Sequence, residues 1–122
     1  MAHAGRSVLV VEDDDDVRAA LTTLLELHGY TVREATNGRE ALAHLADPSA
    51  ICLILLDLFM PDMNGWTFRT EQMKDPRVAH IPVVVISADA SAAKRAVSTG
   101  VIAALTKPVE FETLLQVVGE HC

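Results

Sequence analysis

Apolar residues gather into five short runs that are separated by longer amphipathic segments. The runs are rich in β-branched residues, which favour strands, and they cover residues 8–11, 30–35, 51–56, 83–86 and 101–105. The central runs are apolar throughout rather than alternating, which is typical of strands buried on both faces of a parallel sheet. The pattern therefore predicts five strands inside a layered domain.

The segments between these runs carry helical periodicity. Residues 14–27 place Val17, Leu21 and Leu24 on one face, at the spacing of an amphipathic helix. The remaining predicted helices are 38–45, 64–74, 91–99 and a last one that carries Phe111, Leu114, Leu115 and Val118. Two of them are less regular, because Arg69 and Gln72 interrupt the apolar stripe of 64–74 and 91–99 is Ala-rich and thinly apolar.

Strands and helices thus alternate along a chain of 122 residues, which is the length of one domain. Alternation with right-handed crossovers predicts an α/β fold in which helices cover both faces of a parallel sheet. Five strands favour the doubly wound, flavodoxin-like order 2-1-3-4-5. We expect a single domain over residues 6–121.

Side chains that can react or bind a metal ion directly follow four of the five runs. Glu12 and Asp13 follow the first run, Asp57 the third, Ser87 the fourth and Lys107 the fifth. Reactive groups in such sheets collect beyond the carboxyl ends of the strands. The sequence therefore predicts that three acids, a hydroxyl and a lysine converge on one edge of the sheet.

The acidity of the chain is concentrated in one place. Its net charge of −7 comes from 17 acidic and 10 basic residues, and five of the acids are consecutive at 12–16. Asp14 is expected to cap the first helix, and Asp15 and Asp16 suit its first turn. Glu12 and Asp13 precede the cap, so a helix start does not explain them. The overall charge also argues against direct nucleic-acid binding.

Carboxylates that converge in this way need a counter-charge. Two unit charges about 4 Å apart interact by about 4 kcal/mol at an effective dielectric constant of about 20. Mg²⁺ suits a few carboxylates together with waters and a phosphate. A lysine and a hydroxyl beside such a cation are the parts for transfer of a phosphoryl group to a carboxylate.

Four segments of the chain resemble the receiver domain of two-component response regulators. They read VLVVEDD, LILLDLFMPDMNG, VVVISA and LTKP, and they occur in the order and spacing of that family. The resemblance implies that Asp57 is the phosphoacceptor, Lys107 pairs with the phosphoryl group and Ser87 is the switch hydroxyl. It also implies a cis peptide bond between Lys107 and Pro108.

The same resemblance implies a Mg²⁺ site. Asp13 and Asp57 would bind the metal, Glu12 would lie in the same acid pocket, and the main-chain carbonyl of Phe59 would add a further ligand. One position departs from the family, because Ala104 stands where the family usually has Tyr or Phe. An aromatic ring that normally reports phosphorylation is therefore missing, and we expect the usual readout to be weakened or rerouted.

The resemblance also implies partners. A sensor histidine kinase or a histidine phosphotransfer protein would donate the phosphoryl group, and a protein output partner would bind in trans, unless the chain is a part of a larger kinase or regulator. No apolar run reaches membrane-spanning length, and the first seven residues lack the apolar region of a secretory signal. We therefore expect a cytoplasmic protein without membrane attachment, with Cys52 and Cys122 reduced.

Three other functions are alternatives to this hypothesis. A receiver-like module that binds partners without phosphorylation is the main alternative, and Ala104 favours it. A haloacid-dehalogenase-like phosphatase would use Asp13 as nucleophile, but the chain lacks a second acid pair after Lys107. A flavodoxin-like electron carrier would need a phosphate loop where the acids 12–16 stand. Beyond transfer to itself and its own dephosphorylation, we expect no enzyme activity.

Overall fold

The computed structural model describes residues 6–122, and it consists of a parallel sheet between two layers of helices. The strands are β1 (Ser7–Val11), β2 (Thr31–Ala35), β3 (Ile51–Asp57), β4 (Val83–Ser87) and β5 (Ala103–Thr106). They are all parallel, in the order β2-β1-β3-β4-β5. The predicted fold class and strand order are thus confirmed.

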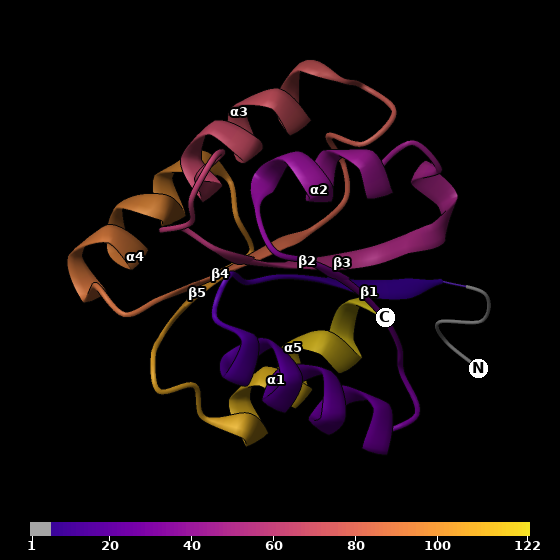
Figure 1. Cartoon of the computed structure of the whole chain (residues 1–122), viewed down its shortest axis with the longest axis vertical. Helices are drawn as coiled ribbons and strands as arrows, with labels where there is room; N and C mark the ends of the chain where they lie inside the picture. The colour runs from indigo at the N-terminus through magenta and orange to yellow at the C-terminus, as the bar shows by residue number, and fades with distance from the viewer. Residues whose placement is uncertain (1–5) are drawn as a thin grey trace.

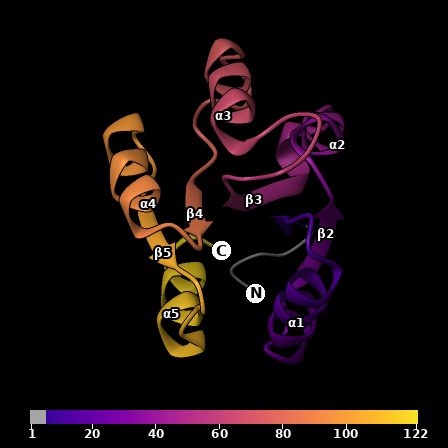
Figure 2. The same ribbon diagram turned by 60° about the vertical axis from the view of Figure 1, so that its left-hand side comes forward.

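The helices cover both faces of this sheet, as Figure 1 shows. They are α1 (Asp15–Leu27), α2 (Gly38–His44), α3 (Gly65–Lys74), α4 (Ala90–Ala96) and α5 (Phe111–His121), with short 3₁₀ turns η1 (Pro48–Ala50) and η2 (Val97–Thr99). Helices α1 and α5 lie together on one side, and α2, α3 and α4 lie on the other; Figure 2 shows the same division from a second direction.

Each face of the sheet has its own apolar core. Leu9, Ile54 and Val85 are buried against the side of α2, α3 and α4, together with Phe68. Alternate residues of the same strands, such as Val10 and Leu55, are buried against the side of α1 and α5. Successive side chains of a strand point to opposite faces, so a strand covered on both sides must be apolar at every position. This is why the central runs do not alternate.

The polar interruption of α3 has a structural explanation. Arg69 and Gln72 are both buried, and Arg69 Nη1 donates a hydrogen bond to Gln72 Oε1 at 2.8 Å. Gln72 Nε2 in turn donates to the main-chain oxygens of Val78 and Ile81 in the loop that leads to β4. A buried amide with these partners holds the loop as an apolar residue would not.

The prediction of reduced cysteines is wrong. Cys52 and Cys122 form a disulfide with a Cα–Cα distance of 5.5 Å, across 70 residues of sequence. Both are buried, Cys52 near the start of β3 and Cys122 just after α5. The apolar surroundings of Cys52 suggested a small buried hydrophobic residue, and no local pattern indicates that the end of α5 packs beside it.

Residues 6–122 contain no helix that is long and apolar enough to cross a membrane. The absence of a signal-like segment was expected from the first seven residues, and residues 1–5 of these lie outside the described part of the chain.

Candidate functional site

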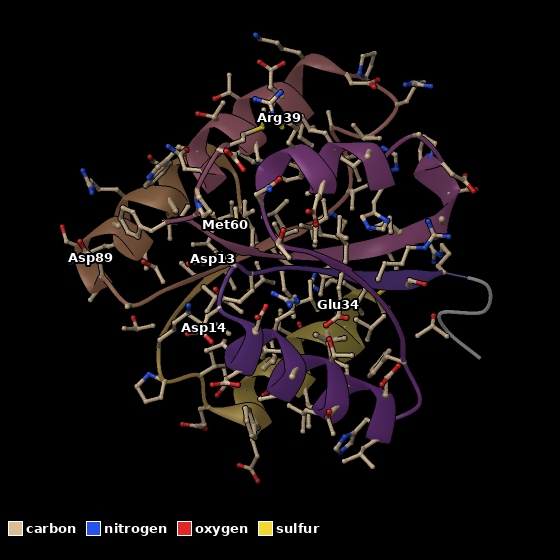
Figure 3. The ribbon with its side chains drawn as sticks, in the orientation of Figure 1. Asp13, Asp14, Glu34, Arg39, Met60 and Asp89 are labelled. Carbon is tan, nitrogen blue, oxygen red and sulfur yellow. A yellow bond between two sulfur atoms is a disulfide. The ribbon has the colours of Figure 1, made fainter. Side chains whose placement is uncertain are left out.

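The site lies at the carboxyl edge of the sheet, where β1 ends at Val11 and the acidic run begins. Glu12 is buried, and its main-chain N–H donates to the carbonyl of Ala35 at the end of β2 at 3.0 Å. Asp13 is exposed beside it. Figure 3 shows Asp13 and Asp14 between the sheet and the beginning of α1. The first strand therefore delivers one buried and one exposed carboxylate.

Asp57 closes the group of acids from the neighbouring strand. It is the last residue of β3 and is only 5% exposed. One carboxylate oxygen from each of Glu12, Asp13 and Asp57 lies within 4.8 Å of the other two. The structure therefore brings together the three acids that the sequence placed at strand ends.

Lys107 reaches the same acids from β5. Its Nζ lies 2.6 Å from Glu12 Oε1 and 3.8 Å from Asp57 Oδ1. Glu12 Oε1 has no partner with the geometry of a hydrogen bond, so we describe its contact with Lys107 as an ion pair. The bond between Lys107 and Pro108 is cis, as predicted. The Lys107 N–H also donates to the main-chain oxygen of Ser87 at 2.8 Å, which ties the ends of β4 and β5 together.

The shared pocket changes the pKa values of Asp57 and Lys107. Burial raises the pKa of Asp57 to about 8, and hydrogen bonding and charge repulsion with Glu12 add to the rise, while Lys107 offsets part of it. Burial alone would lower the pKa of Lys107, but Glu12, Asp57 and Asp13 together raise it above its ordinary value. The single lysine therefore leaves the acids with an excess of negative charge.

Ser87 stands at the end of β4 and is fully buried. Its Oγ accepts a hydrogen bond from the N–H of Asp89 at 3.1 Å. The Asp89 carboxylate caps α4 by accepting from the N–H groups of Ser91 and Ala92. As an acceptor in this bond, Ser87 keeps its own hydroxyl proton to donate.

Phe59 lies in the loop after β3, and its side chain is 53% exposed. A phenyl ring offers no metal ligand, so only its main-chain carbonyl could contribute one. The loop then turns into α3 at Gly65, where a Cβ atom would meet the main-chain oxygen of Asp57 at 2.6 Å. The backbone of α3 therefore approaches the end of β3 at a distance that only glycine permits.

The rest of the acidic run begins the helix, as predicted. Asp14 Oδ1 accepts hydrogen bonds from the N–H groups of Asp16 and Val17, so Asp14 is the N-cap of α1. Asp15 and Asp16 occupy its first turn. Sequence reasoning did not anticipate that Arg18 donates to the main-chain oxygen of Glu12. The available signal was a lone basic residue just after five acids.

The donor set suits a hard divalent cation. Oxygen atoms, carboxylate oxygens among them, are the ligands of Mg²⁺ and Ca²⁺. Each of the three acids presents one oxygen, and these oxygens lie within 4.8 Å of one another. Glu12 Oε1 is a buried oxygen without a hydrogen bond. Burial first, and then the interactions with Glu12, raise the pKa of Asp57, and a second positive charge beside Lys107 would oppose that rise.

Comparison with known proteins shows to which family the chain belongs. The family model described as the response regulator receiver domain matches residues 8–119. The chain belongs to the response regulator receiver domain family. It is a phosphoacceptor signalling domain of two-component systems, and the family match decides against the phosphatase and the electron carrier.

Two curated relatives show where such a receiver domain occurs. The chain is 34% identical to Protein PilH of Pseudomonas aeruginosa over 117 residues, which are 92% of this chain and 93% of PilH. It is also 34% identical to the Sensor histidine kinase CheAY of Helicobacter pylori over 114 residues, which are 91% of this chain but 14% of CheAY. The matched region thus makes up nearly all of one relative and a small part of the other.

Solved structures agree with the fold. A response regulator receiver protein from Pseudomonas putida superposes with a TM-score of 0.86 at 30% identity, over 94% of this receiver domain and 96% of that chain. The Vibrio cholerae chemotaxis protein CheY4 gives a TM-score of 0.84 at 27% identity, over 96% and 98%. This receiver domain therefore has the CheY-like arrangement.

Proposed function

We propose that Asp57 is the phosphoacceptor of this receiver domain. The observation that carries the proposal is the meeting of Asp57 with Glu12, Asp13 and Lys107 at one edge of the sheet. Asp57 is the acid at the end of the central strand β3, and it lies within reach of the lysine. No other group of three or more acidic, histidine or cysteine side chains with metal-binding spacing occurs in residues 6–122.

The reaction is transfer of a phosphoryl group from a phospho-histidine donor. An oxygen of ionised Asp57 attacks phosphorus, an acyl phosphate bond forms, and the N–P bond to the imidazole of the donor breaks. The imidazole nitrogen takes up a proton as it leaves. Water later attacks phosphorus, the bond between the carboxylate oxygen and phosphorus breaks, inorganic phosphate leaves and the carboxylate is restored. The domain is thus a switch that modifies itself and resets, and it turns over no other substrate.

The acids would hold Mg²⁺ for this step. Asp13, Asp57 and the main-chain carbonyl of Phe59 would bind the metal, and Glu12 would complete the pocket. When bound, Mg²⁺ neutralises charge on the transferred phosphoryl group. It also favours the ionised form of Asp57, which must be deprotonated to act as a nucleophile although its pKa is raised to about 8.

Lys107 and Ser87 act on the phosphoryl group itself. Lys107 Nζ, held between Glu12 and Asp57, supplies a point charge to a phosphoryl oxygen. The Ser87 hydroxyl donates a hydrogen bond to another oxygen. The N–H of Asp89 donates a hydrogen bond to Ser87 Oγ, and the carboxylate of Asp89 caps α4. A shift of Ser87 would therefore move the start of α4.

The signal leaves the domain by binding of a protein partner. Phosphorylation adds a charge of about −2 at pH 7, and α4, whose apolar contacts are mostly alanines, is the element that responds. Ala104 is partly buried against the core below α4 but has no ring to turn. The donor is a sensor histidine kinase or a histidine phosphotransfer protein in the cytoplasm, and residues 6–121 form the receiver domain.

Intact mass spectrometry tests the proposal. The protein is incubated with acetyl phosphate and Mg²⁺, and one phosphoryl adduct is expected. EDTA abolishes the adduct, and so does Asp57→Asn, while the matched exposed variant Asp47→Asn keeps it. An adduct on Asp13 would contradict the assignment of Asp57. An unmodified wild-type mass would instead favour a module that binds partners without phosphorylation, the alternative that the absence of a ring at Ala104 supports.

A further inference from the structure

Arg18 lies in the first turns of α1 and reaches back to the loop that carries Glu12 and Asp13. Its Nη1 donates to the main-chain oxygen of Glu12 at 2.9 Å, and its side chain is 15% exposed. The contact is made to the backbone of the acid loop and not to a side chain of the pocket. Arg18 therefore acts on where the acids are placed and not directly on what they bind.

The contacted oxygen belongs to the peptide group that joins Glu12 to Asp13. A peptide group is planar. The direction of the Glu12 carbonyl therefore also fixes the positions of the nitrogen and Cα atoms of Asp13. The preceding peptide group is held too, since the Glu12 N–H donates to the carbonyl of Ala35 at 3.0 Å. The backbone on both sides of Glu12 is thus tied, on one side to the sheet and on the other to Arg18.

The guanidinium group is itself anchored on two elements. Its Nη2 donates to Asp15 on α1, and its Nε lies 3.6 Å from Glu34 Oε2 on β2. Thr22 Oγ1 donates to the same oxygen of Glu34 at 2.9 Å, and Figure 3 shows Glu34 between the sheet and α1. The planar fork of an arginine can make these contacts together, and the ammonium of a lysine cannot.

We infer that Arg18 is a positioning residue that holds the peptide group between Glu12 and Asp13, so that the two acids meet Asp57 in the geometry that Mg²⁺ requires. The inference rests on the proposed function. Mg²⁺ demands nearly octahedral ligands, and groups that orient metal ligands from outside typically change metal affinity by about 10- to 100-fold when they are removed.

A purely electrostatic role for Arg18 makes the opposite prediction. The guanidinium is a positive charge next to the acid pocket, and it repels a divalent cation. If charge alone mattered, Arg18→Gln would strengthen Mg²⁺ binding and Arg18→Lys would leave it unchanged. If Arg18 positions the loop, both substitutions weaken binding.

Isothermal titration of the full chain with Mg²⁺ separates the two roles. We expect Arg18→Gln and Arg18→Lys to bind Mg²⁺ about tenfold more weakly than the wild type. Arg33→Gln is the matched control, because Arg33 is an exposed arginine of β2 whose loss changes the net charge equally, and its affinity should be unchanged. Tighter binding by Arg18→Gln, or unchanged binding by Arg18→Lys, overturns the inference.

A second measurement covers the case in which a variant loses stability. In the absence of metal, the amide of Asp13 reports on the peptide group that Arg18 contacts. Arg18→Lys should shift its ¹H–¹⁵N resonance while the amides of β4 stay in place, and an unmoved Asp13 resonance in a folded variant contradicts the positioning role. A wild type that binds no Mg²⁺ would overturn the proposed function and the inference with it. Unchanged variants beside a wild type that binds would overturn the inference alone.

Discussion

At the carboxyl end of the sheet, Glu12 and Asp57 are buried side by side with Lys107 as their cation, whereas at the amino end β3 is fastened to the end of α5 by a disulfide. At the first end, burial and then the interactions with Glu12 raise the pKa of Asp57 to about 8. The second end, around Cys52 and Cys122, is covalently closed and apolar. The same strand thus begins in a fixed region and ends in a region of excess charge.

The difference shows how one fold serves stability and switching at once. Covalent and apolar contacts at the amino end contribute the same stability whatever the protonation or ligand state of the acids. The carboxylates at the other end repel one another; a cation reduces this repulsion and a phosphoryl group adds negative charge, so the energy of this region changes with its ligand state. Substitutions at the two ends should therefore differ in kind, and those with the largest expected effect come first.

Lys107→Ala should affect the reaction far more than the fold. Loss of one preorganised charge beside a transferred group typically slows a reaction by about 10²- to 10³-fold, and we expect this for the appearance of the phosphoryl adduct with acetyl phosphate, followed by intact mass. Mg²⁺ binding should be retained. Lys74→Ala removes an exposed lysine whose one ion pair among residues 6–122 is with Glu71, and it should react at the wild-type rate. Equal rates for both variants would remove Lys107 from the reaction.

Removal of the disulfide should do the reverse. Replacing Cys52 and Cys122 with serine, or adding a reductant, should lower the free energy of unfolding by about 2 to 4 kcal/mol, because the unfolded chain loses a long closed loop. The phosphorylation rate should change little, since the bond lies at the opposite end of the sheet. Urea unfolding with and without reductant measures the effect, and the serine variant should be insensitive to reductant. A serine variant as stable as the wild type would contradict the structural role of the bond.

Asp57→Asn should stabilise the protein at neutral pH when divalent cations are absent. The pKa of Asp57 is about 8 in the folded state against an ordinary value of 3.8. A raised folded pKa of an acid gives stability that is present below about pH 4 and is lost as the pH rises to about 8. Asparagine cannot ionise, so the variant does not lose this stability as the pH rises. Because the pocket is open to screening on the side of Asp13, we expect a gain of roughly 1 to 2 kcal/mol at pH 8 and none near pH 4.

Thermal unfolding across this pH range checks the sign of the effect. The matched control is Asp47→Asn, which should follow the wild-type profile. Mg²⁺ should stabilise the wild type and have a smaller effect on Asp57→Asn, which lacks one of the three carboxylates. A variant that is less stable than the wild type at pH 8 would show that Asp57 is not held in a region of excess charge.

Two neighbouring acids give the smallest and most local test. Asp14→Ala removes the N-cap of α1 and should cost about 1 kcal/mol of unfolding free energy. Asp13→Ala removes a carboxylate that accepts no main-chain hydrogen bond among the described residues, and it should cost less or even stabilise the metal-free protein. Denaturant unfolding of both variants compares them directly. A larger cost for Asp13 would mean that the two acids do not have separate roles.

Much of the site could be predicted because strand ends are visible in the sequence. Glu12, Asp57 and Lys107 each follow an apolar run, and the rule that strands of a doubly wound sheet present their ends at one edge brings them together. Asp14 could be predicted as a cap because the signal lies within a few residues of the helix start. The four receiver segments then supplied the roles that these residues are proposed to have.

Other features depend on contacts that no local pattern records. Arg69 and Gln72 appeared to weaken α3, yet they hold the loop before β4 because both find buried partners. The 5.5 Å between the Cα atoms of Cys52 and Cys122 depends on how α5 packs beside β3. The approach of Arg18 to the Glu12 carbonyl likewise depends on the angle at which α1 leaves β1.

The sequence by itself determined the order of strands and helices, the edge at which the reactive groups stand and the start of α1. These follow from hydrophobic periodicity and capping, which act between residues close in the chain. Only the tertiary structure decided the disulfide, the hydrogen bonds of Gln72 to the loop before β4 and the hydrogen bond of Arg18 to the main-chain oxygen of Glu12. Such contacts join residues on different elements, and their distances are set by packing between layers, which many sequences with the same periodicity would arrange differently.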